Sequence, residues 1–89
     1  TRQMAVEYGP TVRANVIAPG SIDTPRFRKV AEDMDDPEGF IAGLANIIPA
    51  KRLGTADDVA AIALFLASDQ SAYVSGAVIP ADGGLAALR

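Results

Sequence analysis

The sequence predicts an α/β fold in which two short parallel strands are connected by helices. Apolar, strand-like runs at residues 12–18 and 76–81 are separated by patterns with helical spacing, and turn-forming residues follow each run directly. Parallel strands need a long crossover, so this order makes the two strands parallel, with a right-handed connection. Because two parallel strands do not form an independent sheet, we expect this chain to be the edge of a larger one.

Residues 1–9 have the pattern of the tail of a helix that begins before Thr1. Met4 and Tyr8 share one helical face, and a Gly-Pro pair follows as a stop signal. An initial Thr instead of Met suggests a chain that was processed, trimmed or excised from a longer one. Residues 12–18 then resemble a short buried strand, and the apolar run from Val16 to Ala18 is typical of a parallel strand covered on both faces.

Residues 21–50 are expected to form two short, irregular helices joined by an acidic turn. Thr24 precedes a proline at the first helical position, and this arrangement predicts a helix with Thr24 as its N-cap. The pair Asp35-Asp36 and the proline after it break that helix, and apolar residues then recur at helical spacing up to Pro49.

Residues 55–68 predict a further helix with a capping box, in which Thr55 caps the backbone and Asp58 reaches back to it. The helix from Ala56 to Ser68 is apolar almost all round, so it is expected to be buried on more than one face. The second strand follows at residues 76–81, and Asp82-Gly83-Gly84 turns the chain away.

Composition limits the function. The 89 residues carry a net charge of -3 and fit one soluble globular domain. Because the sequence has no Cys and no His, it excludes disulfides, thiolate or imidazole metal sites and Ser-His catalysis, and we expect no metal. Basic residues form no cluster, so no nucleic-acid partner is expected. Apolar runs are too short to cross a bilayer and no signal peptide opens the chain, which predicts a cytoplasmic protein without a membrane partner.

Two pairs of adjacent aspartates allow a second interpretation, in which Asp35-Asp36 or Asp57-Asp58 form a catalytic or metal-binding pair of carboxylates. Residues adjacent in sequence at a helix start do not face each other, and acidic residues are favoured at that end of a helix in any case. We therefore assign no catalytic residue from these pairs.

Four ordered motifs resemble one known family, the short-chain dehydrogenases/reductases. The first is Arg13-x-Asn15-x-Ile17-x-Pro19-Gly20-x-Ile22-x-Thr24, and the others are Arg52-x-Gly54, Tyr73-Val74-Ser75-Gly76 and Asp82-Gly83-Gly84. Pro-Gly alone means little, but the order and spacing of the set are specific. The resemblance covers nearly the whole chain, from Thr1 to about Gly84, and corresponds to the carboxyl-terminal segment of a family member.

The resemblance implies a doubly wound, Rossmann-type parallel sheet of which this chain supplies the last two strands with their intervening helices. It also implies an NAD or NADP cofactor, whose nicotinamide end lies beyond the first strand of this chain. The cofactor-binding residues carried over are Pro19, Gly20, Ile22 and Thr24. The backbone of Ile22 is expected to bond the carboxamide, Thr24 to hold the carboxamide or pyrophosphate, and Pro19-Gly20 to let the chain approach the ring.

Structural alternatives remain open for several residues. Asn15 is compatible with a purely structural hydrogen bond to backbone, Thr24 with a plain N-cap, and Asp82-Gly83-Gly84 with a turn near a subunit contact.

Residues 23–49 would form a variable lid over an alcohol or carbonyl substrate with an apolar portion. Candidate walls of its pocket, for which simple packing is the alternative, are Phe27, Met34, Phe40, Ile41 and Leu44.

The family's Tyr-x-x-x-Lys and Gly-rich turn do not occur in these 89 residues, since Val12 follows Tyr8 and Ala77 follows Tyr73 at the lysine spacing. The resemblance places the catalytic pair just upstream of Thr1, so the chain alone is expected to be inactive.

Three hypotheses follow. The first is the carboxyl-terminal part of an NAD(P)-dependent oxidoreductase. The second is a non-catalytic assembly module, a homo-oligomer formed through the helix from Ala56 to Ser68 and the strand from Ala77 to Ala81. The third, independent nucleotide binding, is the weakest because the chain has no glycine-rich phosphate cradle.

Overall fold

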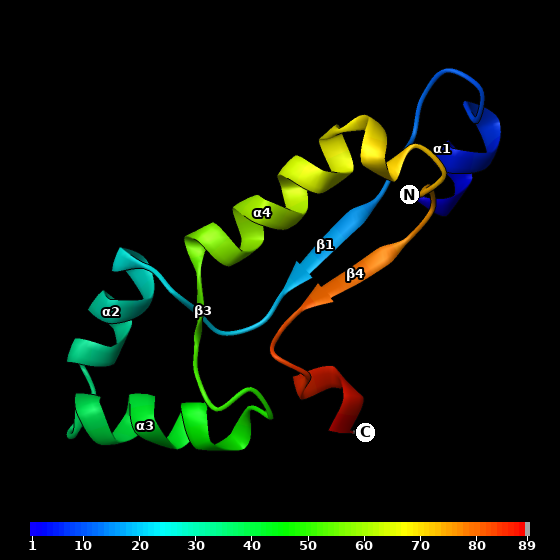
Figure 1. The fold of residues 1–89 in the computed structure, drawn as a ribbon. Coiled ribbons are helices and arrows are strands. Elements are labelled where there is room, and N and C mark those ends of the chain that lie inside the picture. Colours follow the sequence, from blue (N-terminus) through cyan, green and yellow to red (C-terminus); the bar gives the residue numbers. More distant parts are fainter. Residues whose placement is uncertain (89) are drawn as a thin grey trace.

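The computed structural model describes residues 1–88 and is an open α/β arrangement (Figure 1). Strand β1 (Val16–Pro19) pairs in parallel with β4 (Val78–Ala81), with Val16 opposite Val78 and Pro19 opposite Ala81. The helices α2 (Pro25–Glu32), α3 (Pro37–Ile47) and α4 (Ala56–Ala67) lie between these strands in the sequence. The α/β prediction, with parallel strands and intervening helices, is therefore confirmed.

The first strand is shorter and later than the run at 12–18. Before Val16, one backbone bond joins the two segments, from the Gly76 N–H to the Ala14 carbonyl (2.7 Å), and side chains make the other contacts. Ala14 N–H donates to Ser75 Oγ (3.3 Å), and Ala77 N–H donates to Asn15 Oδ1 (3.0 Å). Asn15 Nδ2 also donates to the Val74 carbonyl at 3.1 Å. Asn15 thus bonds backbone, which agrees with its structural alternative, but it bridges two segments instead of closing a local turn.

A second, very short parallel pair was not expected from the sequence. Strand β2 (Ile22–Asp23) pairs with β3 (Gly54–Thr55), and the Gly54 N–H donates to the Ser21 carbonyl at 3.0 Å. This pair joins the two ends of the segment that contains α2 and α3. The segment is therefore closed at its base, where β1 has just ended.

Helix α4 begins with the capping box that the sequence predicts. The Thr55 hydroxyl accepts from the Asp58 N–H at 3.1 Å, and an Asp58 carboxylate oxygen accepts from the Thr55 N–H at 2.8 Å. The helix runs alongside β1 (Figure 1). Within residues 1–88 it is not buried on more than one face, because Leu64 is 73% exposed and Phe65 is 42% exposed.

Few side chains are fully buried. The buried apolar residues are Ala31 and Ile48, and Ser71 is completely buried. The shorter helical segments are α1 (Arg2–Glu7) and the 3₁₀ turns η1 (Asp69–Ser71) and η2 (Leu85–Leu88). No helix in the described part of the chain is long and apolar enough to cross a membrane.

Candidate cofactor-side loop

The loop at residues 19–24 leaves β1 at its carboxyl end, beside the turn that follows β4. The Gly20 N–H donates to the Ala81 carbonyl at 3.0 Å. A Cβ atom at Gly20 would lie only 2.7 Å from the Cβ and 2.9 Å from the Cα of Asp82. Glycine is therefore needed at position 20 for a contact within this chain, quite apart from any ligand.

The turn that follows β4 is held by its own hydrogen bonds. The Asp82 carboxylate accepts from the N–H groups of Gly84 and Ala86, each at 3.0 Å. The Gly83 carbonyl accepts from the Ala50 N–H at 3.0 Å, and Gly83 has a φ of 64°, which favours glycine. The turn thus supports the loop on one side and the end of the 21–50 segment on the other.

Ile22 is held by β3 through its neighbours. Because Gly54 bonds to Ser21, the parallel pattern directs the N–H and C=O of Ile22 to the side away from β3. A Cβ at Gly54 would lie 2.6 Å from Ile22 Cδ1, so the two segments are in close contact. The backbone polar groups of Ile22 are left for a partner other than β3.

Thr24 is the N-cap of α2, as the sequence predicts. Its hydroxyl oxygen accepts from the Phe27 N–H at 3.1 Å, and a proline occupies the first helical position. A threonine hydroxyl that accepts one bond still has a proton to donate. The cap therefore leaves Thr24 able to bond a ligand as well.

Asp23 and Arg28 form a two-pronged ion pair beside the cap. Arg28 Nε donates to Asp23 Oδ1 at 2.7 Å and a terminal nitrogen donates to Oδ2 at 2.8 Å. These hydrogen bonds lower the pKa of the Asp23 carboxyl and raise the pKa of Arg28. The pair is largely exposed, so its effect is to orient the start of α2 more than to stabilise the fold.

The proposed pocket walls do not all behave alike. Phe27 and Phe40 stack on each other with ring centroids 6.3 Å apart and planes 21° from parallel, so the packing alternative holds for this pair. Ile41 and Leu44 are half-buried on α3, and Met34 is exposed in the turn between the helices.

A hollow of about 410 Å³ lies beyond the carboxyl ends of β1 and β4, between the loop and η2. Pro19, Gly20, Pro80 and Asp82 are among its lining residues. Ligands of open α/β sheets bind at this end of the strands. Of the four predicted cofactor-binding residues, Pro19 and Gly20 line this hollow, whereas Ile22 and Thr24 lie further along the loop and do not line it.

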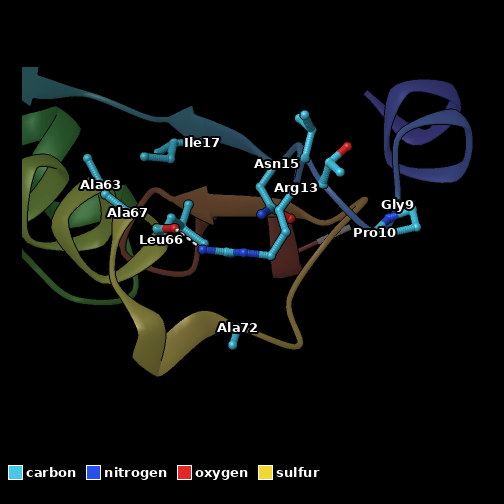
Figure 2. Close-up of a pocket in the computed structure, with 11 residues that line it drawn as sticks. Gly9, Pro10, Arg13, Asn15, Ile17, Ala63, Leu66, Ala67 and Ala72 are labelled. Atoms are coloured by element: carbon cyan, nitrogen blue, oxygen red, sulfur yellow. Dashed lines mark hydrogen bonds between the residues drawn. The ribbon is translucent and has the colours of Figure 1, made fainter.

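A larger cavity, of about 880 Å³, lies near the opposite end of β1 (Figure 2). It is lined by the turn after α1, the start of β1 and the end of α4. In an open α/β sheet that end carries no ligand, so we assign the candidate site to the loop instead.

Sequence reasoning missed the contacts that hold this loop, Gly20 against Asp82 and Ile22 against Gly54. Gly20 and Gly54 each belong to one of the sequence motifs, and this was the signal that the two positions matter. A motif does not predict, however, which distant residue each glycine contacts.

Fold and loop together define a carboxyl-terminal part of a Rossmann-type sheet. Residues 1–86 match the family model of Enoyl-(Acyl carrier protein) reductase. The chain is 49% identical over 74 residues to 3-oxoacyl-[acyl-carrier-protein] reductase MabA of Mycobacterium tuberculosis, covering 83% of this chain and 28% of MabA. It is 41% identical over 90 residues to levodione reductase of Leifsonia aquatica, covering 98% of this chain and 34% of that enzyme.

Solved structures agree with these relatives. The crystal structure of levodione reductase superposes with a TM-score of 0.89 at 40% identity, over 100% of this chain and 36% of that one. The NADPH dependent reductase YwfH superposes with a TM-score of 0.85 at 35% identity, over 94% and 34% of the two chains. The chain belongs to the short-chain dehydrogenase/reductase family, and it spans about a third of the length of these relatives.

Proposed function

We propose that residues 1–89 form the nicotinamide-side part of an NAD(P)-dependent oxidoreductase that acts on an alcohol or carbonyl group. The observation that carries the proposal is the loop at residues 19–24, which stands beyond the carboxyl end of β1 with the backbone of Ile22 facing away from β3. The chain is similar to YwfH, an NADPH dependent reductase, which supports a nicotinamide cofactor.

The residues of the loop fit the nicotinamide end of such a cofactor. Gly20 presents no side chain beside the hollow, Ile22 offers backbone donor and acceptor groups, and Thr24 keeps a hydroxyl proton. When bound, the cofactor supplies hydride chemistry. Pro19, Gly20, Ile22 and Thr24 would orient it, and the segment of α2 and α3 would cover the substrate as a lid.

The proton donor of the proposed reaction is not assigned to either tyrosine of this chain. Tyr73 is fully exposed and Tyr8 is half exposed, and neither is followed by a lysine four residues later. We therefore expect residues 1–89 to bind and orient, and not to catalyse hydride transfer by themselves.

A chimera tests the proposal. Residues 1–89 would replace the matching part of levodione reductase, which the chain resembles over almost its full length, and NADH and NADPH would be titrated by fluorescence. Thr24→Ala should raise the coenzyme dissociation constant about fivefold, the scale of one hydrogen bond of about 1 kcal/mol. Thr11→Ala, in the turn between α1 and β1, is the matched control. A coenzyme affinity that Thr24→Ala leaves unchanged would contradict the assigned contact.

A second candidate function is assembly without catalysis. Leu64 and Phe65 on α4 and Val78 on β4 are exposed apolar residues on the two elements in question. Exposed apolar surface of this kind favours association with a second copy. Sedimentation of the chain would distinguish the two: a defined oligomer that Leu64→Glu dissociates, with no response to either coenzyme, favours assembly.

A further inference from the structure

Arg13 makes the most extensive set of side-chain hydrogen bonds in the described part of the chain, yet it lies far from the loop at residues 19–24. One terminal nitrogen donates to Ser71 O (2.8 Å), Ser71 Oγ (3.0 Å) and Val74 O (3.1 Å). The other donates to Leu66 O (3.0 Å) and Ser68 O (3.3 Å). Figure 2 shows the guanidinium extended from the start of the β1 segment to the end of α4.

These acceptors are groups that a helix end leaves without partners. The last carbonyls of α4 have no intrahelical donors, and they carry the negative end of the helix dipole. A guanidinium is planar, permanently charged and carries donors on both forks, so it can serve the helix end and the following turn together. Ser71, completely buried, completes the cluster by bonding to the carbonyls of Leu66 and Ser68.

The same helix is tied to the same segment at its other end. Ile22 and Asp23 pair with Gly54 and Thr55, and Thr55 is the N-cap of α4. Residues 13–23 and residues 54–68 therefore form a closed ring, with Arg13 as one tie and the β2–β3 pair as the other. Helix α4, with 12 residues and about 18 Å of stiff length, sets the separation of the two ties.

Arg13 also bonds the segment that precedes β4, through the Val74 carbonyl, so it lies at the start of the β1–β4 register. Next to Arg13, the Gly76 N–H donates to the Ala14 carbonyl at 2.7 Å, and from Val16 opposite Val78 the pairing continues to Gly20, which touches Asp82. A slip of one residue in this register would turn every side chain to the other face and remove the Gly20 contact. Arg13 therefore lies at the start of the pairing between the two strand segments, and the Gly20 contact in the loop at residues 19–24 lies at its end.

We propose that Arg13 is a positioning residue for the loop at residues 19–24, which it holds through the ring of β1, α4 and the β2–β3 pair. The inference rests on the proposed function only for its coenzyme readout. Lysine cannot replace Arg13, because a single ammonium with three donors does not reach both the α4 carbonyls and those of the turn. Arg13→Lys keeps the charge and so isolates the loss of the fork.

The test uses the natural polypeptide that contains residues 1–89, with Arg13→Lys, Ser71→Ala and the exposed Arg2→Lys as a matched control. Hydrogen exchange of peptides spanning residues 17–24 and the affinity for NADH and NADPH are measured on each. Arg13→Lys should speed exchange in 17–24 and raise the coenzyme dissociation constant roughly three- to tenfold, the scale of one hydrogen bond. Ser71→Ala should act in the same direction more weakly, and Arg2→Lys should change neither.

A purely structural Arg13 would lower the melting temperature while leaving exchange in 17–24 and coenzyme affinity unchanged, and that result overturns the proposal. Faster exchange confined to residues 66–76 overturns it as well. If Arg13→Lys does not fold, Ser71→Ala decides by the same two readouts. If the unmodified polypeptide binds neither coenzyme, yet exchange in 17–24 responds to Arg13→Lys, the positioning role stands and the proposed function fails.

Discussion

At the scale of single residues, Gly20 and Gly43 differ in what surrounds them. A Cβ at Gly20 would lie 2.7 Å from Asp82 Cβ, whereas a Cβ at Gly43, inside α3, would meet nothing within 4 Å. Gly20→Ala should lower the stability by about 1–3 kcal/mol through overpacking. Gly43→Ala should raise it by about 0.5–1 kcal/mol, because alanine loses less conformational freedom in a helix.

The measurement is the urea midpoint of the natural polypeptide with each substitution. Both substitutions add one methyl group, so the opposite changes in stability that we expect depend only on where that group is placed. A midpoint that Gly20→Ala leaves unchanged would show that the loop moves away from the turn after β4 at little cost.

Caps were predictable at this scale, and distant contacts were not. Thr24 and Thr55 are N-caps because the signal for a cap lies within three residues of it, and both predictions are confirmed. Gly20 and Asp82 are 62 positions apart, so no local pattern relates them. Cofactor binding by Pro19, Gly20, Ile22 and Thr24 stays a prediction.

Among the elements, the start of α4 carries a pH dependence that can be measured. Hydrogen bonds from Arg52 and from the Thr55 N–H lower the pKa of Asp58 to about 2. An unfolded aspartate has a pKa of about 3.9, so the ionised cap stabilises α4 above about pH 4 and is lost as the pH falls toward 2. Asp58→Asn should remove this part of the acid-induced loss of helix.

Circular dichroism of the helix signal between pH 6 and about pH 2 checks this, with Asp57→Asn as the control. Asp57 is the adjacent acid in the first turn of α4, but it is not part of the capping box. Equal loss of helix in the unmodified chain and in Asp58→Asn would show that the box does not govern α4 in acid.

Elements were predictable as far as their signals were local. Helices with caps and prolines were predicted, whereas β1 is shorter than the run at 12–18 that predicted it. The reason is that the Ala14 N–H bonds the Ser75 side chain and the Asn15 side chain bonds the Ala77 N–H, in place of regular strand pairing. Strands β2 and β3 have two residues each and leave no periodicity, so their pairing depends on tertiary contacts alone.

The whole molecule is less compact than a domain of its length. Its radius of gyration is 16.1 Å, against about 12 Å for a compact chain of this size. Fully buried apolar residues are limited to Ala31 and Ile48 among those described, while Leu64 is largely exposed. Unless the open faces of α4 and β1 are covered, the burial that stabilises a cooperative fold is missing.

Residues 1–89 by themselves should therefore unfold with a broad, weakly cooperative transition, or melt at a temperature that rises with protein concentration because an oligomer is formed. Calorimetry over a range of concentrations, with sedimentation on the same samples, separates these outcomes. A sharp, concentration-independent transition of a monomer would contradict the expectation, since it would require more buried apolar surface than this arrangement supplies. Leu64→Glu should abolish any concentration dependence, because it places a charge on the exposed face of α4 that a second copy would have to bury.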